Sequence, residues 1–324
     1  MTTISPALKP MRIGASPIAQ PPLCFGGSWY VPYGSPSEQD AHLTAAMQAA
    51  FDAGVRHFDT GAGYGGGHSE ELYGRFIADK RDQIFIASKA NPAEATAASM
   101  YEQVEGSLGR LGVDTIDLYY IHWPRTGWDM RPTMEGLERA RAEGKIGAVG
   151  VSNFSVTEMA QVAEVGTIDA HQLGYNLLWR YPEDDVIDWC TRHGTTVITY
   201  STLAHGILTG KFGRDPGLRE GDQRHGILPF REDIWPHVYE GVEQLKAIAA
   251  ERDRPLAHLA IRWALSRPGI AATIIGGRNA EQVESVMPAL EGDIDQSVFD
   301  RMTAISDEIV KHVPNAGNLF GRVG

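Results

Sequence analysis

Cysteine, long apolar runs and basic side chains are all scarce in this sequence. The 324 residues include two cysteines, Cys24 and Cys190, too few for a disulfide framework or a cysteine-based zinc site. We therefore expect a chain kept in a reducing compartment, the cytoplasm. No stretch approaches the roughly 18 consecutive apolar residues of a membrane span. The proline-rich residues 1–22 hold no apolar run of signal-peptide length, so we expect no export.

Acidic side chains outnumber basic ones. Asp and Glu total 41 and Lys and Arg total 29, which makes the formal net charge −12 at pH 7. Such a charge repels nucleic-acid phosphates and anionic lipid headgroups, so we expect neither a nucleic acid nor a membrane as partner. With 43% apolar and 22% charged residues, the composition is that of a globular protein with a large core.

Short apolar runs alternate with longer amphipathic stretches along the chain. Each run has the length and the Val, Ile, Phe and Tyr content of a buried strand. Several of the stretches between them end at a glycine suited to a helix C-cap, such as Gly112 and Gly194. No linker divides the chain, so we treat residues 1–324 as one domain with an irregular segment at 1–21. The predicted strands are Leu23–Gly26, Val55–Asp59, Ile84–Lys89, Thr115–His122, Ile146–Ser152, Ala170–Leu173, Thr196–Tyr200 and Ala272–Ile275.

This alternation predicts a (β/α)8 TIM barrel of the α/β class, because strands that alternate with helices pair in parallel through right-handed crossovers. An open doubly wound sheet is the competing fold. It usually carries a Gly-x-Gly-x-x-Gly turn after its first strand, and Gly26–Trp29 does not fit that pattern. The interval after Tyr200 is more than twice the roughly 30 residues of a βα unit. We therefore expect a long loop over Leu203–Pro229 and extra helices over Ile234–Arg252 and Pro255–Arg267.

Polar side chains end most of the predicted strands, and in such a barrel the carboxyl ends of the strands form the active-site face. Asp59, Lys89 and His122 end the second, third and fourth strands, which predicts a carboxylate, an ammonium and an imidazole at one mouth. Tyr64 follows Asp59 in a glycine-rich loop that can return its phenol over that mouth. The later strands end in Ser152-Asn153, Gln172 and Tyr200-Ser201.

The loop Asp59–Glu71 reads Asp-Thr-Gly-Ala-Gly-Tyr-Gly-Gly-Gly-His-Ser-Glu-Glu. It resembles the aldo-keto reductases, in particular bacterial members with a Gly-x-Ser-Glu stretch after the catalytic tyrosine. The resemblance runs in order from about Leu23 to about Val286, and its four catalytic positions match Asp59, Tyr64, Lys89 and His122. It also implies an NADP(H) site formed by Ser152, Asn153, Gln172, Tyr200, Ser201, Leu203, Gly206, Lys211, Gly276, Arg278 and Gln282.

The expected reaction is reduction of an aldehyde or ketone to the alcohol. No side chain supplies a hydride, so a nicotinamide must do so, and Tyr64 is expected to donate the proton. We expect Lys89 to lower the pKa of Tyr64, Asp59 to hold Lys89, and His122 to orient the substrate oxygen. Arg278 lies beside two glycines before a short helix, which favours NADP(H) over NAD(H) because a guanidinium binds phosphate in a bidentate manner.

Two positions depart from the family pattern. Thr202 stands where a proline usually follows the Tyr-Ser pair, and Ser285-Val286 stands in place of a Glu-Asn pair that commonly holds the adenine. The second departure removes an amide, so we expect it to weaken the grip on the adenine.

The substrate wall and some alternative functions are less determined by sequence. Trp29, Tyr30 and Trp123 fall in loops after the first and fourth strands and are predicted to line a pocket for a sugar, aromatic or alicyclic carbonyl compound. A sugar dehydrogenase working oxidatively stays open, as does a non-catalytic, cofactor-sensing subunit like the reductase-fold partners of potassium channels. His57-Phe58-Asp59 would suit a metal-dependent hydrolase, but further ligands are missing beside it, and we expect no metal.

Overall fold

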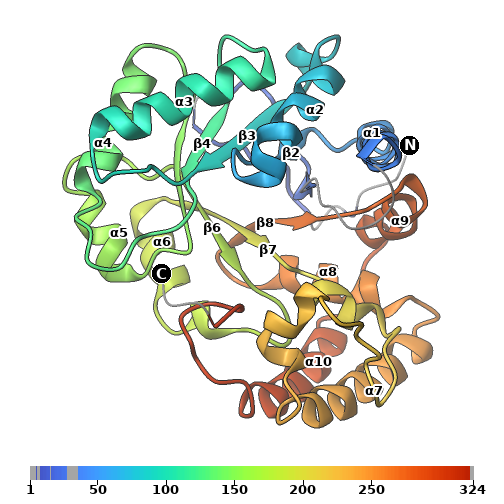
Figure 1. Cartoon of the computed structure of the whole chain (residues 1–324). Helices are drawn as coiled ribbons and strands as arrows, with labels where there is room; N and C mark the ends of the chain where they lie inside the picture. The colour runs from blue at the N-terminus through green and yellow to red at the C-terminus, as the bar shows by residue number, and fades with distance from the viewer. Residues whose placement is uncertain (1–4, 6–7, 15, 28–35, 322–324) are drawn as a thin grey trace.

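The computed structural model describes residues 5, 8–14, 16–27 and 36–321. A closed barrel of eight parallel strands, arranged in chain order, lies at its centre (Figure 1). The barrel predicted from the alternation is confirmed, and each strand falls within or close to a predicted apolar run. The strands are β1 Leu23–Gly26, β2 His57–Asp59, β3 Phe85–Ala90, β4 Leu118–Ile121, β5 Val149–Ser152, β6 Ala170–Gly174, β7 Thr196–Tyr200 and β8 Ile270–Ile275.

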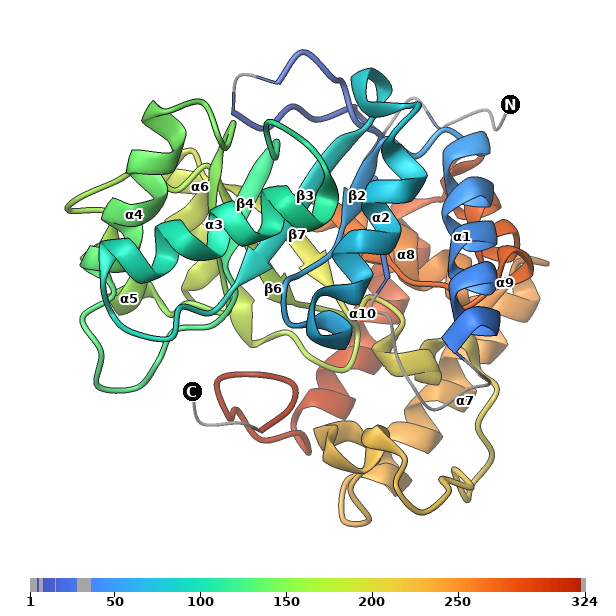
Figure 2. The same ribbon diagram turned by 45° about the horizontal axis from the view of Figure 1, so that its top comes forward.

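Helices surround the barrel, and α1 packs beside α9 (Figures 1 and 2). Local sequence sets their ends: the Thr96 side chain accepts a hydrogen bond from the Ser99 backbone at the start of α3. Gly112 and Gly194 end α3 and α6 at φ 65° and 70°, the left-handed caps predicted for them. The helices are α1 Pro36–Asp52, α2 His68–Ile77, α3 Ala97–Leu111, α4 Arg131–Ala142, α5 Val156–Val162, α6 Val186–His193, α7 Trp235–Glu251, α8 Leu256–Ser266, α9 Ala280–Val286 and α10 Gln296–Val310.

Strand side chains divide between two cores. Those that point inward, such as Phe85 and Tyr120, fill the barrel, and those that point outward pack under the helices. Met11 and Ile13 join the inner core from the segment expected to be irregular, in which Met11 and Gln20 form an antiparallel bridge. Because Phe85 begins β3, this segment covers the end of the barrel at which the strands begin.

The long interval between β7 and β8 contains the expected helices α7 and α8. The stretch expected to be a loop is partly regular, with short 3-10 helices at Ala204–Thr209, Gln223–Gly226 and Leu228–Phe230. Ile207, Leu208 and other apolar side chains of this stretch are buried in the main core, so packing orders a segment whose glycines alone favour a loop.

Helix α10 packs against α7, and no sequence expectation covered it. Val298, Phe299, Met302 and Ile309 form its buried face, a helical spacing that was visible in the sequence. Beyond α10 the chain turns back toward the barrel (Figure 2), where the Leu319 carbonyl accepts a hydrogen bond from the Leu228 amide. Among the residues described, no helix is long and apolar enough to cross a membrane.

Candidate active site

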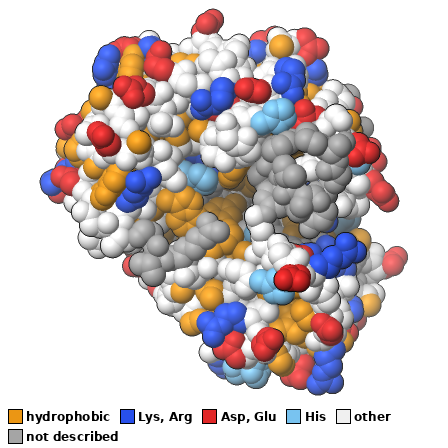
Figure 3. Space-filling model, in the orientation of Figure 1, with side chains coloured by type: hydrophobic (Ala, Val, Ile, Leu, Met, Phe, Trp, Pro, Cys, Tyr) orange, Lys and Arg blue, Asp and Glu red, His pale blue; other side chains and the backbone are white. Residues whose placement is uncertain are grey.

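The carboxyl ends of the strands bring the predicted catalytic side chains together. In the orientation of Figure 1, the surface is hollowed near its centre and hydrophobic side chains gather in the hollow (Figure 3). Asp59 ends β2 and pairs in register with Ala87 of β3. Lys89 lies two residues further along the same face of β3, because alternate side chains of a strand share a face.

Asp59 and Lys89 form a buried ion pair, with side chains 5% and 1% exposed. The Lys89 ammonium donates hydrogen bonds to the Asp59 carboxylate and, at 2.8 Å, to the Thr60 carbonyl. Burial alone lowers the pKa of Lys89, but the charge of Asp59 and the nearby Tyr64 outweigh it, so that the pKa is raised. The ammonium therefore stays charged at neutral pH.

Tyr64 lies against this pair, at the start of a short 3-10 helix that leads into α2. The Lys89 Nζ atom is 5.2 Å from the centre of the Tyr64 ring. Gly61 makes this approach possible, since a Cβ there would come within 3.1 Å of Lys89 and 3.4 Å of the tyrosine ring. After Tyr64, Gly65–Gly67 all have positive φ, between 60° and 100°, a run that suits glycine alone.

The pKa of Tyr64 differs from the sequence expectation. Lys89 lowers it, as expected, but burial is the larger influence and the Asp59 charge adds to it, so the pKa of Tyr64 is raised above its usual value. A charged neighbour stabilises the phenolate only as far as its own counter-ion allows. The phenol therefore holds its proton at neutral pH.

His122 follows β4 and completes the group, with its ring edge-on to Tyr64 at 5.8 Å between ring centres. Burial and the Lys89 charge lower the pKa of His122 to about 3. The imidazole is therefore neutral, with one N–H donor and one acceptor nitrogen. We refer to Asp59, Tyr64, Lys89 and His122 as the tetrad.

Gln172 of β6, predicted to hold the cofactor amide, lies inside the barrel mouth and is buried. Its Nε2 atom donates to the Asp59 carboxylate at 2.8 Å. Lys89 and Gln172 thus occupy different oxygens of Asp59. The carboxylate is consequently held from two strands, a role for Gln172 that its position in the sequence does not indicate.

Asn153 follows β5 with φ 64° and connects the tetrad to β7. Its amide nitrogen donates to the His122 carbonyl at 3.1 Å and to the Ser152 hydroxyl at 3.0 Å. Its amide oxygen accepts from the Tyr200 hydroxyl at 2.7 Å. Ser152, Asn153 and Tyr200, predicted from the ends of two different strands, therefore form one connected group.

Phe320, near the end of the described chain, lies in the same mouth. Its ring stacks on Tyr200 with 6.3 Å between ring centres and an interplanar angle of 14°. It also lies edge-on to Trp123, a predicted substrate-pocket residue, at 6.0 Å. Trp29 and Tyr30, the other predicted pocket residues, lie outside the described residues. Phe320 was not predicted because no local pattern marks a residue so far along the chain from both of its ring partners.

Three cations gather on the β7 and β8 side of the mouth. Partial burial and the charges of Arg224 and Arg278 lower the pKa of Lys211, and Lys211 and Arg224 both lie over the Phe212 ring, at 5.1 and 5.3 Å from its centre. Lys211 and Arg278 were predicted to contact the cofactor, whereas Arg224, which pairs with Asp222, was missed. We refer to Lys211, Arg224 and Arg278 as the cation cluster.

Several residues that precede Lys211 in the chain have left-handed backbone. Ser201, which hydrogen-bonds His205 at 3.1 Å, has φ 54°, and Gly206 has φ 95°. A Cβ on Gly206 would come within 3.0 Å of the Lys211 Nζ atom, so glycine leaves room for the ammonium against the backbone. Leu203, also predicted at this site, directly precedes the 3-10 helix Ala204–Thr209 and accepts from the Gly206 amide at 2.9 Å.

The segment after β8 is shaped by glycine and by the cap of α9. A Cβ on Gly276 would meet the Gly26 carbonyl at 3.2 Å. The Gln282 side chain accepts a hydrogen bond from the Arg278 amide at 3.0 Å, and Asn279 caps the helix through the Gln282 amide. Gln282 thereby shapes the backbone at Arg278.

The two departures from the family pattern have structural explanations. Thr202 is buried, with its hydroxyl bonded to Thr273 and to the Ile274 carbonyl, so a side chain hydrogen bond stands where proline was expected. Val286 is buried in the main core, whereas Ser285 is exposed and bonds the Gln282 carbonyl. Val286 therefore contributes to the hydrophobic core at the position where the family pattern has an asparagine.

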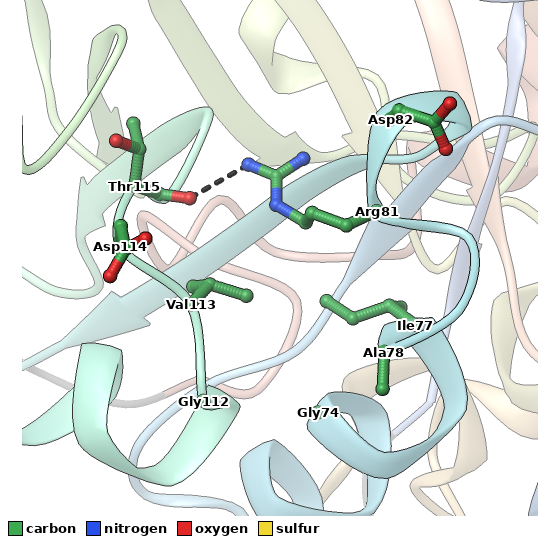
Figure 4. Close-up of a pocket in the computed structure, with 9 residues that line it drawn as sticks. All are labelled: Gly74, Ile77, Ala78, Arg81, Asp82, Gly112, Val113, Asp114 and Thr115. Atoms are coloured by element: carbon green, nitrogen blue, oxygen red, sulfur yellow. Dashed lines mark hydrogen bonds between the residues drawn. The ribbon is translucent and has the colours of Figure 1, made fainter.

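Two other features are set apart from this site. His57 is buried and bonded to Gln20 at 2.9 Å, and no cluster of metal-ligating side chains occurs among the described residues. A groove lies where α2 and α3 end and β4 approaches, with Arg81 reaching across it toward Thr115 (Figure 4). That guanidinium already bonds the carbonyls of Thr115 and Ile84 and the Asp117 carboxylate, so the groove is a structural junction.

A barrel whose strand ends hold a phenol, a buried lysine–aspartate pair and a neutral imidazole has the equipment of an acid–base enzyme. The cation cluster beside them fits a phosphorylated ligand. The chain belongs to the aldo/keto reductase family, a family of oxidoreductases, whose pattern it matches over residues 22–307.

Individual relatives cover most of the chain. It is 34% identical over 251 residues to the aldo-keto reductase YhdN of Bacillus subtilis, covering 74% of this chain and 76% of that protein. The structure of the glycerol dehydrogenase AKR11B4 from Gluconobacter oxydans matches it with a TM-score of 0.84 and 28% identity, over 96% of this chain and 98% of the other. An aldo/keto reductase from Klebsiella pneumoniae, solved with NADP and acetate, matches with a TM-score of 0.75 and 27% identity, over 98% and 100% of the two chains.

Proposed function

We propose that this protein is an NADP(H)-dependent reductase that converts an aldehyde or ketone to the alcohol, with Tyr64 as the proton donor. The observation that carries the proposal is the tetrad: a protonated phenol lies against a buried ammonium, beside a neutral imidazole. That combination suits the delivery of a proton to an oxygen on which negative charge develops.

Each tetrad residue has a distinct part in this step. The Tyr64 hydroxyl donates its proton to the substrate oxygen, and the Lys89 ammonium stabilises the phenolate that remains. Asp59 and the Thr60 carbonyl hold that ammonium in place. Neutral His122 donates a hydrogen bond to the same oxygen, a contribution typically of about 3 kcal/mol to the barrier.

The residues around the mouth fit NADP(H), a nicotinamide adenine dinucleotide phosphate. Lys211, Arg224 and Arg278 supply the cations that a diphosphate and an additional phosphate require, and Gly206 leaves room for the Lys211 ammonium against the backbone. The Tyr200 ring and the amides of Asn153 and Gln172 would face the nicotinamide. When bound, the nicotinamide supplies the hydride. The Klebsiella relative, which was solved with NADP, supports this assignment.

The substrate is expected to be a small carbonyl compound that fits beside Trp123 and Phe320. The same groups run the reaction in reverse, from an alcohol, and the similarity to a glycerol dehydrogenase makes polyols worth testing. Cys24 and Cys190 are buried free thiols, in keeping with action in the reducing cytoplasm.

The test is a screen of the purified protein. NADPH absorbance is followed with a panel of aldehydes, ketones and keto-sugars, and NADP⁺ reduction is followed with glycerol and other polyols. We expect NADPH oxidation with at least one carbonyl class and its loss in Tyr64→Phe. Tight NADPH binding without turnover of any compound would favour the cofactor-sensing alternative instead.

A further inference from the structure

Ser69 and Glu70 lie behind the tetrad, at the start of α2. They belong to the Gly-x-Ser-Glu stretch noted in the sequence, and neither has a part in the proposed chemistry. Both side chains are completely buried. A buried carboxylate is costly unless it is paired and hydrogen-bonded, so its partners show what it holds together.

Glu70 joins three elements through its two carboxylate oxygens. One oxygen accepts a hydrogen bond from the Ser88 hydroxyl of β3, and the other pairs with the Arg110 Nε atom of α3 at 2.6 Å. The Arg110 side chain in turn packs against Gly67, where a Cβ would come within 2.6 Å of it. The end of the Tyr64 loop is therefore fixed to β3 and α3 at once.

The contact with Ser88 acts on the neighbour of a tetrad residue. Ser88 directly precedes Lys89, and successive side chains of a strand point to opposite faces. Lys89 points into the barrel toward Asp59, and Ser88 points out toward α2. Glu70 thus holds the outer face of β3 at the point where its inner face carries the ammonium.

Ser69 secures the other end of the same loop. Its hydroxyl lies 2.8 Å from the Thr60 hydroxyl and donates to the Gly27 carbonyl at 3.2 Å. The Thr60 carbonyl accepts from the Lys89 ammonium. Between these two fixed ends, Gly65–Gly67 have little conformational preference of their own, so the place of Tyr64 depends on how the ends are held.

We propose that Glu70, together with Ser69, is a positioning residue for the reaction: Glu70 fixes the Gly67 end of the Tyr64 loop to β3 and α3, Ser69 fixes the Thr60 end, and the two keep the phenol against Lys89. The proposal rests on the proposed function for its kinetic consequence. Its structural consequence, a loop held at both ends, stands apart from any activity.

The kinetic test compares Glu70→Gln with a matched control. Asp117→Asn also removes a carboxylate that is bound to β3. Asp117 accepts a hydrogen bond from the Ile86 amide and pairs with Arg81, at the opposite end of that strand. We expect Glu70→Gln to lower kcat at least 10-fold, with KM within 3-fold and the NADPH Kd within 2-fold. Asp117→Asn is expected to keep kcat within 2-fold of the unmodified protein, even if its Tm falls as much as that of Glu70→Gln. Ser88→Ala removes a single hydroxyl and is expected to show a smaller loss of the same kind.

Hydrogen exchange provides a readout that needs no turnover. In Glu70→Gln we expect amides from residues 60 to 67 to exchange at least 10-fold faster than in the unmodified protein, and the remainder of the barrel to be unchanged. If the unmodified protein reduces no carbonyl but exchange is faster in Glu70→Gln, the proposed function is rejected and the role of Glu70 in holding the loop is kept. A folded Glu70→Gln protein with kcat within 2-fold, or with unchanged exchange over residues 60 to 67, would overturn the positioning role, as would a kcat loss in Asp117→Asn equal to that in Glu70→Gln. If Glu70→Gln does not fold, Ser88→Ala decides by the same two measurements.

Discussion

The two sides of the barrel mouth, the tetrad and the cation cluster, differ in how the charges of their cationic side chains are balanced. In the tetrad, the charge of Lys89 is matched within the protein by Asp59, and Gln172 and Thr60 complete the hydrogen bonds. In the cation cluster, partial burial and then the charges of Arg224 and Arg278 lower the pKa of Lys211, while Asp222, the ion-pair partner of Arg224, opposes them. The charge of Lys89 is thus balanced inside the barrel, whereas the pKa of Lys211 is still lowered, so an anion bound beside Lys211 would stabilise its charged form.

This difference matches the two tasks that we propose. A proton donor must keep one geometry through many turnovers, so its charges are paired and buried. A phosphate site must bind and release a charged ligand, so its cations lie near the surface on separate segments. The comparison predicts that substitutions on one side change the reaction step and substitutions on the other change cofactor affinity.

The largest effect is expected from Tyr64→Phe. Loss of the proton donor should lower carbonyl reduction by about 10²–10⁴-fold, while the NADPH Kd stays within a few-fold. Steady-state NADPH absorbance and tryptophan fluorescence titration measure the two quantities. Tyr101→Phe, which removes a hydroxyl bonded to Glu143 away from the mouth, is the control. Near-normal turnover in the Tyr64→Phe variant would mean that Tyr64 is not the proton donor.

On the other side of the mouth, Arg278→Ala should weaken NADPH binding and leave turnover at saturating cofactor nearly unchanged. The expected loss is roughly 1.5–3 kcal/mol, the scale of a hydrogen bond to a charged group, with NADH binding almost unaffected. Fluorescence titration with both nucleotides gives the comparison, and Arg224→Ala shows whether the third cation shares the phosphate. Equal losses for NADPH and NADH would reject the phosphate role of Arg278.

A smaller effect per side chain concerns the neutrality of the tetrad histidine and two other buried histidines. The pKa values of His57, His122 and His171 are lowered to about 3, so below pH 6.5 the unfolded chain takes up protons that the folded protein does not. Stability should therefore be complete above pH 6.5 and fall as pH decreases toward 3, by at most about 1.4 kcal/mol per pH unit for each histidine.

Urea unfolding at pH 7.5, 6.5 and 5.5 measures this dependence. His122→Asn should reduce the slope by up to one proton, since Asn does not titrate. A stability that is constant over this interval in the unmodified protein would mean that the histidines take up protons equally in the folded and unfolded states, and that the tetrad does not hold His122 neutral.

Phe320→Ala should have the smallest effect, because Phe320 packs against Trp123 and Tyr200, which belong neither to the tetrad nor to the cation cluster. Loss of its contacts with Trp123 and Tyr200 is expected to raise KM for an aromatic carbonyl substrate. The increase should correspond to about 0.5–1.5 kcal/mol of binding free energy, the scale of an aromatic pair. We expect kcat and the NADPH Kd to stay within 3-fold. A kcat loss as large as that of Tyr64→Phe would place Phe320 within the reaction step instead.

Much of the barrel could be predicted because its signals are local. Short apolar runs that alternate with amphipathic stretches report the strand and helix periods directly, and all eight strands lie where those runs predicted them. The tetrad followed from the polar residues at the strand ends and from the family resemblance. The single-domain organisation and the roles of the predicted site residues stay predictions.

What only the tertiary structure decided depends on contacts between distant segments. The chain returns Phe320 to Tyr200 and brings Arg224 and Arg278 near enough to Lys211 for their charges to lower its pKa, and no local pattern encodes either approach. Helix α10 was not predicted, although its apolar spacing is visible in the sequence, because it lies beyond Val286, where the family resemblance noted in the sequence ends. The raised pKa of Tyr64 was missed for a physical reason: the sequence shows which charges are near, but burial sets how strongly each protonation state is disfavoured, and burial exists only in the folded chain.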